Sequence, residues 1–178
     1  MRIGLISDTH IPEAGDRLPT DVYRTFEGVE LILHAGDMHV LAVLDWLEQI
    51  APVIAVRGNG DEGDGTRPRP PDDPRLADDI QILEAGGLRI GMRHSVTPAG
   101  YHYYPTVTSM MERFFGVHLD VIVQGDTHVA EIEYREGVLV VNPGSPTLPH
   151  NLTRRPGTVA LLDIVDGVPE ARIVQLRE

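Results

Sequence analysis

Short apolar segments that each end in an aspartate, asparagine or histidine could build a metal site in this chain. After the apolar residues 3–6, Asp8 and His10 follow at a spacing of two. Side chains alternate along an extended backbone, so these two can point to the same side. Equivalent polar residues follow three further apolar segments, namely Asp37, Asn59, and the pair Asp126 and His128. We interpret this recurrence as a polar cluster at the carboxyl edge of a sheet.

The composition limits the chemistry of such a cluster. The chain has no cysteine, which excludes disulfides and thiolate-based metal or nucleophile chemistry. Oxygen and imidazole ligands suit Mn, Fe, Ni, Zn or Mg. The formal net charge of −12 argues against stable nucleic-acid binding, because such binding depends largely on neutralising phosphates. Bound cations could still attract a phosphate locally.

The 178 residues suffice for one domain with a proper core, so we expect a single domain over residues 1–178. No apolar run approaches the roughly 20 residues that span a bilayer, and the first residues do not resemble a signal peptide. We therefore expect no membrane association and a cytoplasmic location.

Strands alternate with helices in the expected order of elements, which favours an α/β layered fold. Strands are expected over residues 2–7, 31–35, 53–56, 80–83, 88–92, 121–124, 130–134, 138–142, 158–164 and 171–176. Helices are expected over 21–27 with Thr20 as N-cap, over 40–50 and over 107–115. Residues 58–74, rich in Gly, Asp and Pro, are expected to form a functional loop. A parallel first half and an antiparallel second half predict two packed sheets with helices outside.

Five blocks in this order resemble the calcineurin-like metallophosphoesterases, in particular the small bacterial and archaeal phosphodiesterase branch that includes the retromer subunit Vps29. The blocks are Asp8-Thr9-His10, Gly36-Asp37, Gly58-Asn59, His94 and Gly125-Asp126-Thr127-His128. Residues 142–145, Asn-Pro-Gly-Ser, resemble a late turn of that branch, so the match covers nearly the whole chain. The resemblance implies the α/β (α+β) class and a four-layer αββα sandwich of two mixed β-sheets flanked by helices.

The same resemblance implies a ligand set and catalytic residues. The first metal ion would be bound by Asp8, His10 and His128, the second by Asn59, His94 and Asp126, with Asp37 bridging the two; Asp37, Asn59 and His94 would be catalytic. Two divalent ions roughly 3.5–4 Å apart can acidify a bridging water and clamp the oxygens of an in-line displacement. We expect two divalent ions, with Mn²⁺ favoured over Fe, Ni, Zn or Mg.

Two departures from the family pattern affect the expected activity. Asp126 replaces the usual histidine; its carboxylate can still bind a hard ion, although the position, affinity or identity of that ion would change. Gly60 replaces a histidine that protonates the leaving group in larger members, so we expect substrates with good leaving groups. Asp61 and His102 are both left open as replacements for that acid.

Other polar residues are given simpler roles. His34 is interpreted as a core or positioning residue rather than a ligand. The histidines at 39, 118 and 150 are expected in solvent or at helix ends. Residues 101–104 are left open between a pocket wall, a subunit contact and loop packing, and residues 142–145 are expected to shape the backbone below the site.

The sequence therefore predicts a metal-dependent phosphoesterase, most specifically a phosphodiesterase, that hydrolyses a small phosphoester by attack of a metal-bridging hydroxide at a dinuclear site. The alternative is a catalytically weak or inactive protein-binding scaffold like Vps29 on the same fold. Retention of the acids and imidazoles favours the enzyme, because like charges gathered without a cation cost stability. Residues 60 and 126 partly favour the scaffold. Only the resemblance suggests a homodimer, and the sequence names neither substrate nor native metal.

Overall fold

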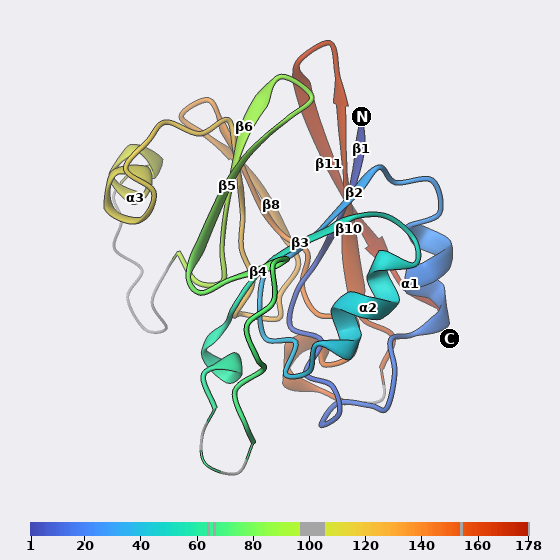
Figure 1. Cartoon of the computed structure of the whole chain (residues 1–178). Coiled ribbons are helices and arrows are strands. Elements are labelled where there is room, and N and C mark those ends of the chain that lie inside the picture. The colour runs from blue at the N-terminus through green and yellow to red at the C-terminus, as the bar shows by residue number, and fades with distance from the viewer. Residues whose placement is uncertain (64, 66, 97–105, 154, 178) are drawn as a thin grey trace.

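The computed structural model describes residues 1–63, 65, 67–96, 106–153 and 155–177. The strands in these residues form two sheets (Figure 1). The first has the order β11-β10-β1-β2-β3-β4. Its strands are β1 (Arg2–Ile6), β2 (Leu31–His34), β3 (Val53–Val56), β4 (Leu76–Ala77), β10 (Thr158–Val165) and β11 (Val168–Gln175). Strands β1 to β4 run parallel, whereas β10 is antiparallel to β1 and to β11.

The second sheet has the order β5-β6-β7-β9-β8. Its strands are β5 (Ile80–Ala85), β6 (Leu88–Arg93), β7 (Val121–Val123), β8 (Glu131–Arg135) and β9 (Val138–Asn142). The central strands β6, β7 and β9 run parallel, and the two outer pairs are antiparallel. The expectation of a purely antiparallel second half is therefore wrong. Each of the hairpins β5–β6 and β8–β9 places one of its strands in the parallel centre of this sheet.

Three apolar layers hold the molecule together. Helices α1 (Thr20–Thr25) and α2 (Ala42–Glu48) pack on the outer face of the first sheet. A second layer fills the space between the sheets, and α3 (Val107–Phe114) covers the outer face of the second sheet. This is the predicted four-layer αββα sandwich of two mixed sheets, which is confirmed (Figure 1).

The period of two along β1 explains how the layers are filled. Ile3 and Leu5 pack between the two sheets, whereas Ile6 faces the helices. Because both faces of the sheet are covered, the central strands are apolar along their whole length instead of alternating with polar residues. The central strands β1, β2, β3, β7 and β9 therefore carry polar side chains only at their first or last residue.

Some short features differ from the sequence-based expectations. The strand β4 and the 3-10 helix η1 (Asn59–Asp61) were not expected, because two or three residues show no readable period. The expected N-cap is wrong: Thr20 is the first helical residue, and Pro19 precedes it without a capping side chain. Proline suits the start of a helix because its φ is fixed and it has no N–H to satisfy.

The parallel strands of both sheets end at one edge of the molecule, at the lower side of Figure 1. The first residues after β1, β2 and β3 meet there the first residues after β6 and β7. Among the described residues, none of the helices has the length and apolar character needed to cross a bilayer.

Candidate metal centre

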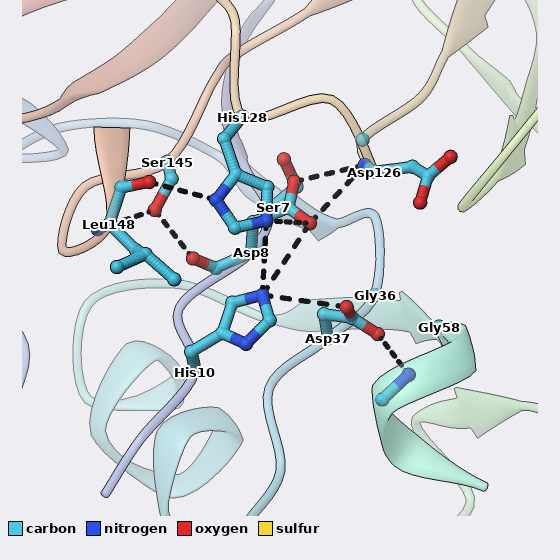
Figure 2. Close-up of polar contacts among 12 residues, drawn as sticks. Ser7, Asp8, His10, Gly36, Asp37, Gly58, Asp126, His128, Ser145 and Leu148 are labelled. Carbon is cyan, nitrogen blue, oxygen red and sulfur yellow. Dashed lines mark hydrogen bonds and ion pairs between the residues drawn. The ribbon is translucent and has the colours of Figure 1, made fainter. Parts of the chain in front are cut away.

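Loops from both sheets bring acids and imidazoles together at this edge. His10 Nε2 lies 3.2 Å from His128 Nε2 and 3.9 Å from Asp8 Oδ1. His128 Nε2 lies 3.5 Å from the same Asp8 oxygen. Figure 2 shows these three side chains pointing toward one another. Ligands about 2.1 Å from a common ion lie roughly 3–4.3 Å apart, so one cation fits among them.

Asp37 offers one oxygen to this group and the other to a second group. Its Oδ2 lies 3.4 Å from His10 Nε2, and its Oδ1 lies 3.5 Å from His94 Nε2. His94 Nε2 lies 3.8 Å from Asp126 Oδ1, and Figure 2 shows the Asp126 carboxylate turned away from the His10–His128 pair. Asp37 thus lies between two clusters of possible ligands.

Backbone carbonyls fix the orientation of two imidazoles. His94 Nδ1 is 2.7 Å from the carbonyl oxygen of Ala35, and His128 Nδ1 is 2.8 Å from that of Leu148. A carbonyl can only accept, so each Nδ1 carries a hydrogen, and each Nε2 is the free position that faces the acids. His94 Nε2 is buried without a hydrogen-bond partner among the described residues. Buried polar atoms are rarely left in this state, and a divalent cation fits this donor set.

Burial and charge–charge interactions shift the pKa values of the clustered residues in opposite directions. Burial raises the pKa of Asp8 to about 6 and lowers that of His10 to about 4. Burial also disfavours the charged forms of Asp37 and His94, but their mutual attraction outweighs it. The pKa of Asp37 therefore falls well below its usual range, and that of His94 rises to about 9. The proton on His94 offsets part of the acidic charge, and a bound cation would replace it.

The loops hold a backbone conformation that is uncommon outside glycine. Three tripeptides of the form Asp-x-His have both outer residues at positive φ: Asp8 (54°) and His10 (45°), Asp37 (56°) and His39 (72°), Asp126 (74°) and His128 (59°). Such conformations cluster at functional sites, where the surrounding structure maintains them. The same local turn therefore recurs after β1, β2 and β7.

Asp61 holds two of these loops together and is no candidate for a leaving-group acid. It is fully buried, and its two oxygens accept backbone N–H groups of Asp37, Met38, His39 and Gly58 at 2.7–3.4 Å. Since the side chain is fully buried and both oxygens accept backbone N–H groups, neither oxygen is available to a substrate. The suggestion that Asp61 replaces the missing acid is therefore wrong, and His102, the other candidate, lies outside the described residues.

Asn59 differs from the other predicted ligands. Its side chain is exposed and lines a cavity that also includes Gly58 and His94. The structure thus brings six of the predicted ligands into contact and leaves Asn59 at their rim. The six are Asp8, His10, Asp37, His94, Asp126 and His128.

The expectation that His39 lies in solvent or at a helix end is wrong, because it lies buried in the turn between β2 and α2. Its side chain is buried, its ring packs edge-on against that of His10 with centroids 4.4 Å apart, and its Nδ1 is 2.7 Å from Glu13 Oε2. The spacing of two after Asp37, shared with the other Asp-x-His pairs, is the signal that could have identified it. By contrast, His118 and His150 are exposed as expected.

His34 and residues 142–145 support the site from below, as expected. His34 is fully buried, accepts the Gly36 N–H, and contacts Thr9 Oγ1 at 3.2 Å. Ser145 Oγ donates to the backbone oxygen of Asp8 at 2.6 Å, and Asn142 Nδ2 donates to that of Gly125 at 2.8 Å. These bonds hold the ligand-bearing turns. Residues 101–104, for which three roles were left open, lie outside the described part of the chain.

Comparisons with known proteins identify the family of the chain. Residues 1–167 match the family model described as the calcineurin-like phosphoesterase superfamily domain. A probable metallophosphoesterase of Methanothermobacter thermautotrophicus is 38% identical over 151 residues, covering 84% of this chain and 79% of the relative. A phosphodiesterase of Methanocaldococcus jannaschii is 29% identical over 81% of this chain and 83% of its own. The crystal structure of Vps29 with Zn²⁺ from Entamoeba histolytica superposes with a TM-score of 0.70 at 22% identity, covering 98% and 99% of the two chains.

The chain belongs to the calcineurin-like phosphoesterase superfamily. It is a metal-dependent hydrolase of phosphoesters, and the acid–imidazole cluster is the part of the fold that suits divalent ions. The likeness to Vps29 shows the shared fold.

Proposed function

We propose that this protein is a phosphodiesterase with two divalent ions bridged by Asp37. The observation that supports this most strongly is that the two oxygens of the Asp37 carboxylate face different histidines, one His10 and the other His94. Asp8, His10 and His128 would hold the first ion; His94, Asp126 and, after a small rotation from the rim, Asn59 would hold the second. Mn²⁺ is the favoured metal, because mixed oxygen and imidazole sets suit it.

Each residue of the cluster has a definite task in this proposal. Two bound ions supply an activated water and neutralise charge on the phosphoryl oxygens. Both oxygens of Asp8 accept the backbone N–H of Asp126, and this contact joins the turn after β7 to the turn after β1. Asp37 is oriented by the Gly60 N–H, which donates to Oδ1 at 2.7 Å. His94 and His128 present fixed Nε2 atoms, so little side-chain ordering remains to be done when ions and substrate bind.

The proposed substrates are small phosphodiesters with good leaving groups. Position 60 has no side chain, and both oxygens of the neighbouring Asp61 are occupied by backbone N–H groups. Neither position 60 nor Asp61 therefore supplies an acid for the leaving oxygen. General acid help is typically worth about 10²–10⁴-fold, so poor leaving groups should react more slowly by that order.

Removal of metal is the direct test. We expect protein treated with a chelator and then dialysed to lose hydrolysis of bis(p-nitrophenyl) phosphate, and Mn²⁺ to restore it. Elemental analysis of the restored protein should give two ions per chain. The melting temperature should also rise with metal, because an ion that binds the folded state stabilises it. Protein that holds one ion and is fully active would refute the dinuclear site.

The rival function is a Vps29-like binding scaffold, supported by the absent side chain at position 60 and the carboxylate at position 126. A scaffold does not need buried acids and imidazoles that face one another. Protein that binds no metal and stays inert after Mn²⁺ addition would favour the scaffold over the enzyme.

We expect Asp126→His to raise the turnover of a diester several-fold. An imidazole would return a neutral nitrogen ligand to the second ion and remove one negative charge from the path of an anionic substrate. Histidine also tolerates the left-handed backbone at this position better than most residues do. Steady-state kinetics with metal analysis checks this, and unchanged turnover with unchanged metal content would contradict the view that residue 126 contacts the second ion.

A further inference from the structure

His39 is a buried histidine in the cluster that neither the expected ligand set nor the proposed mechanism uses. Its side chain is 4% exposed, and its Nε2 is buried without a hydrogen-bond partner among the described residues. Buried polar atoms are rarely left without a hydrogen-bond partner, so a partner is expected at that point. The question is what the Nε2 atom faces.

The other ring nitrogen of His39 is already committed. Its Nδ1 lies 2.7 Å from Glu13 Oε2, and Glu13 is itself paired with Arg67 at 2.8 Å. A carboxylate oxygen at this distance accepts the Nδ1 hydrogen of His39. With Nδ1 bonded to Glu13, Nε2 is the ring position left for a further partner. Histidines that bind metals commonly donate their second nitrogen to a carboxylate in this way.

His39 lies beside Asp37 and His10. One ligand atom from each of His10, Asp37 and His39 can be chosen so that all three lie within 4.8 Å of one another. Ligands at about 2.1–2.2 Å from a shared ion lie up to about 4.3 Å apart, so shifts of a few tenths of an ångström would close the site. A Cβ at position 60 would lie 2.7 Å from His39 Nε2, which shows that the missing side chain leaves the room for this ring.

His39 also has the backbone of the other ligand-bearing histidines. It follows Asp37 at a spacing of two with a φ of 72°, as His10 follows Asp8 and His128 follows Asp126. On these grounds we propose that His39 is a further ligand of the metal centre, sharing a cation with His10 and Asp37 and oriented by Glu13. Two imidazoles and a carboxylate suit a transition-metal ion better than Mg²⁺. The inference rests on the proposed metal-dependent function.

Nitrogen NMR of the histidine rings tests this without any activity measurement. Metal-free, ¹⁵N-labelled protein is titrated with ZnCl₂, and the His39 ring signals are assigned by their absence in His39→Asn, a residue that tolerates positive φ. We expect the Nε2 resonances of His39, His10 and His128 to move together while His39 Nδ1 stays protonated. Movement of His10 and His128 with no change at His39 would overturn the proposal. No movement of any ring would instead overturn the metal centre itself.

Affinity measurements give a second, independent result. By calorimetry with Zn²⁺, His39→Asn should weaken binding by more than tenfold, and Glu13→Gln by roughly 10–100-fold, the range typical for loss of a carboxylate behind a metal-bound histidine. The exposed His118→Ala is the matched control and should bind as the unmodified chain does. Unchanged affinity in His39→Asn would refute the role of His39 as a ligand. Unchanged affinity in Glu13→Gln alone would refute the orienting role of Glu13.

Discussion

Asp37→Asn is expected to lose metal content and turnover together, with kcat/KM for a diester falling by roughly 10²–10³-fold. The loss of several kcal/mol of transition-state stabilisation corresponds to that range. The carboxylate offers oxygens 3.4 Å and 3.5 Å from His10 and His94, whereas an amide has a single good oxygen ligand. One of the two ions would therefore lose its shared ligand.

The fold of Asp37→Asn should survive. The amide oxygen can still accept the Gly60 N–H, and the backbone N–H of residue 37 still donates to Asp61. Circular dichroism should therefore match that of the unmodified chain, while elemental analysis should find less than two ions. Asp166→Asn, in the turn between β10 and β11 and also at positive φ, is the control and should change neither quantity. Full activity in Asp37→Asn would remove Asp37 from its bridging role.

Gly58→Ala is expected to damage the site through one methyl group. Gly58 has φ −102° and ψ 177°, which alanine adopts without strain, so the backbone is not the obstacle. A Cβ at position 58 would lie 2.0 Å from Asp37 Oδ1 and 2.6 Å from the Asp37 backbone nitrogen. Both distances are far below van der Waals contact. Either Asp37 or the whole turn after β3 has to move.

The expected outcome for Gly58→Ala is destabilisation by about 1–3 kcal/mol, as is usual for overpacking, with loss of metal binding. Chemical denaturation and calorimetry with Mn²⁺ measure the two effects. Gly167→Ala is a useful control, because nothing in the described part of the chain would lie within 4 Å of its Cβ. Its φ of 76° should cost about 1–2 kcal/mol without affecting metal binding. Normal metal binding in Gly58→Ala would contradict the geometry of the Asp37 contact.

Much of this arrangement could be predicted because it has a regular sequence signal. The pattern of apolar strands followed by polar residues predicted the sheet edge that bears the site and most residues of the metal-ligand cluster. It could do so because the carboxyl ends of parallel strands lie at the same edge of a sheet. The antiparallel second half was predicted wrongly because the sequence shows strands and turns but does not show which strands pair. Strand β9, for example, follows β8 in a hairpin and also lies parallel to β7.

Roles that depend on contacts between loops could not be predicted. Asp61 was considered a catalytic substitute, and only the backbone N–H groups around it show that it supports the turns. Glu13 lies in a turn with no distinguishing pattern and meets His39 across 26 residues of sequence. The spacing of two between Asp37 and His39 was a signal for His39 itself. Histidines in loops are so often exposed, however, that this spacing alone does not predict a buried role.

The ring orientations of His94 and His128 are fixed by hydrogen bonds to main-chain oxygens, those of Ala35 and Leu148. Every amino acid brings such an oxygen, so the identity of the anchoring residue is irrelevant to the ring that it holds. Substitutions at 35 and 148 that fit the available space should be silent, and descendants of this chain can diverge at both positions without misdirecting either imidazole. The orientation of these two imidazoles therefore depends on the backbone conformation at positions 35 and 148 and not on which amino acids stand there.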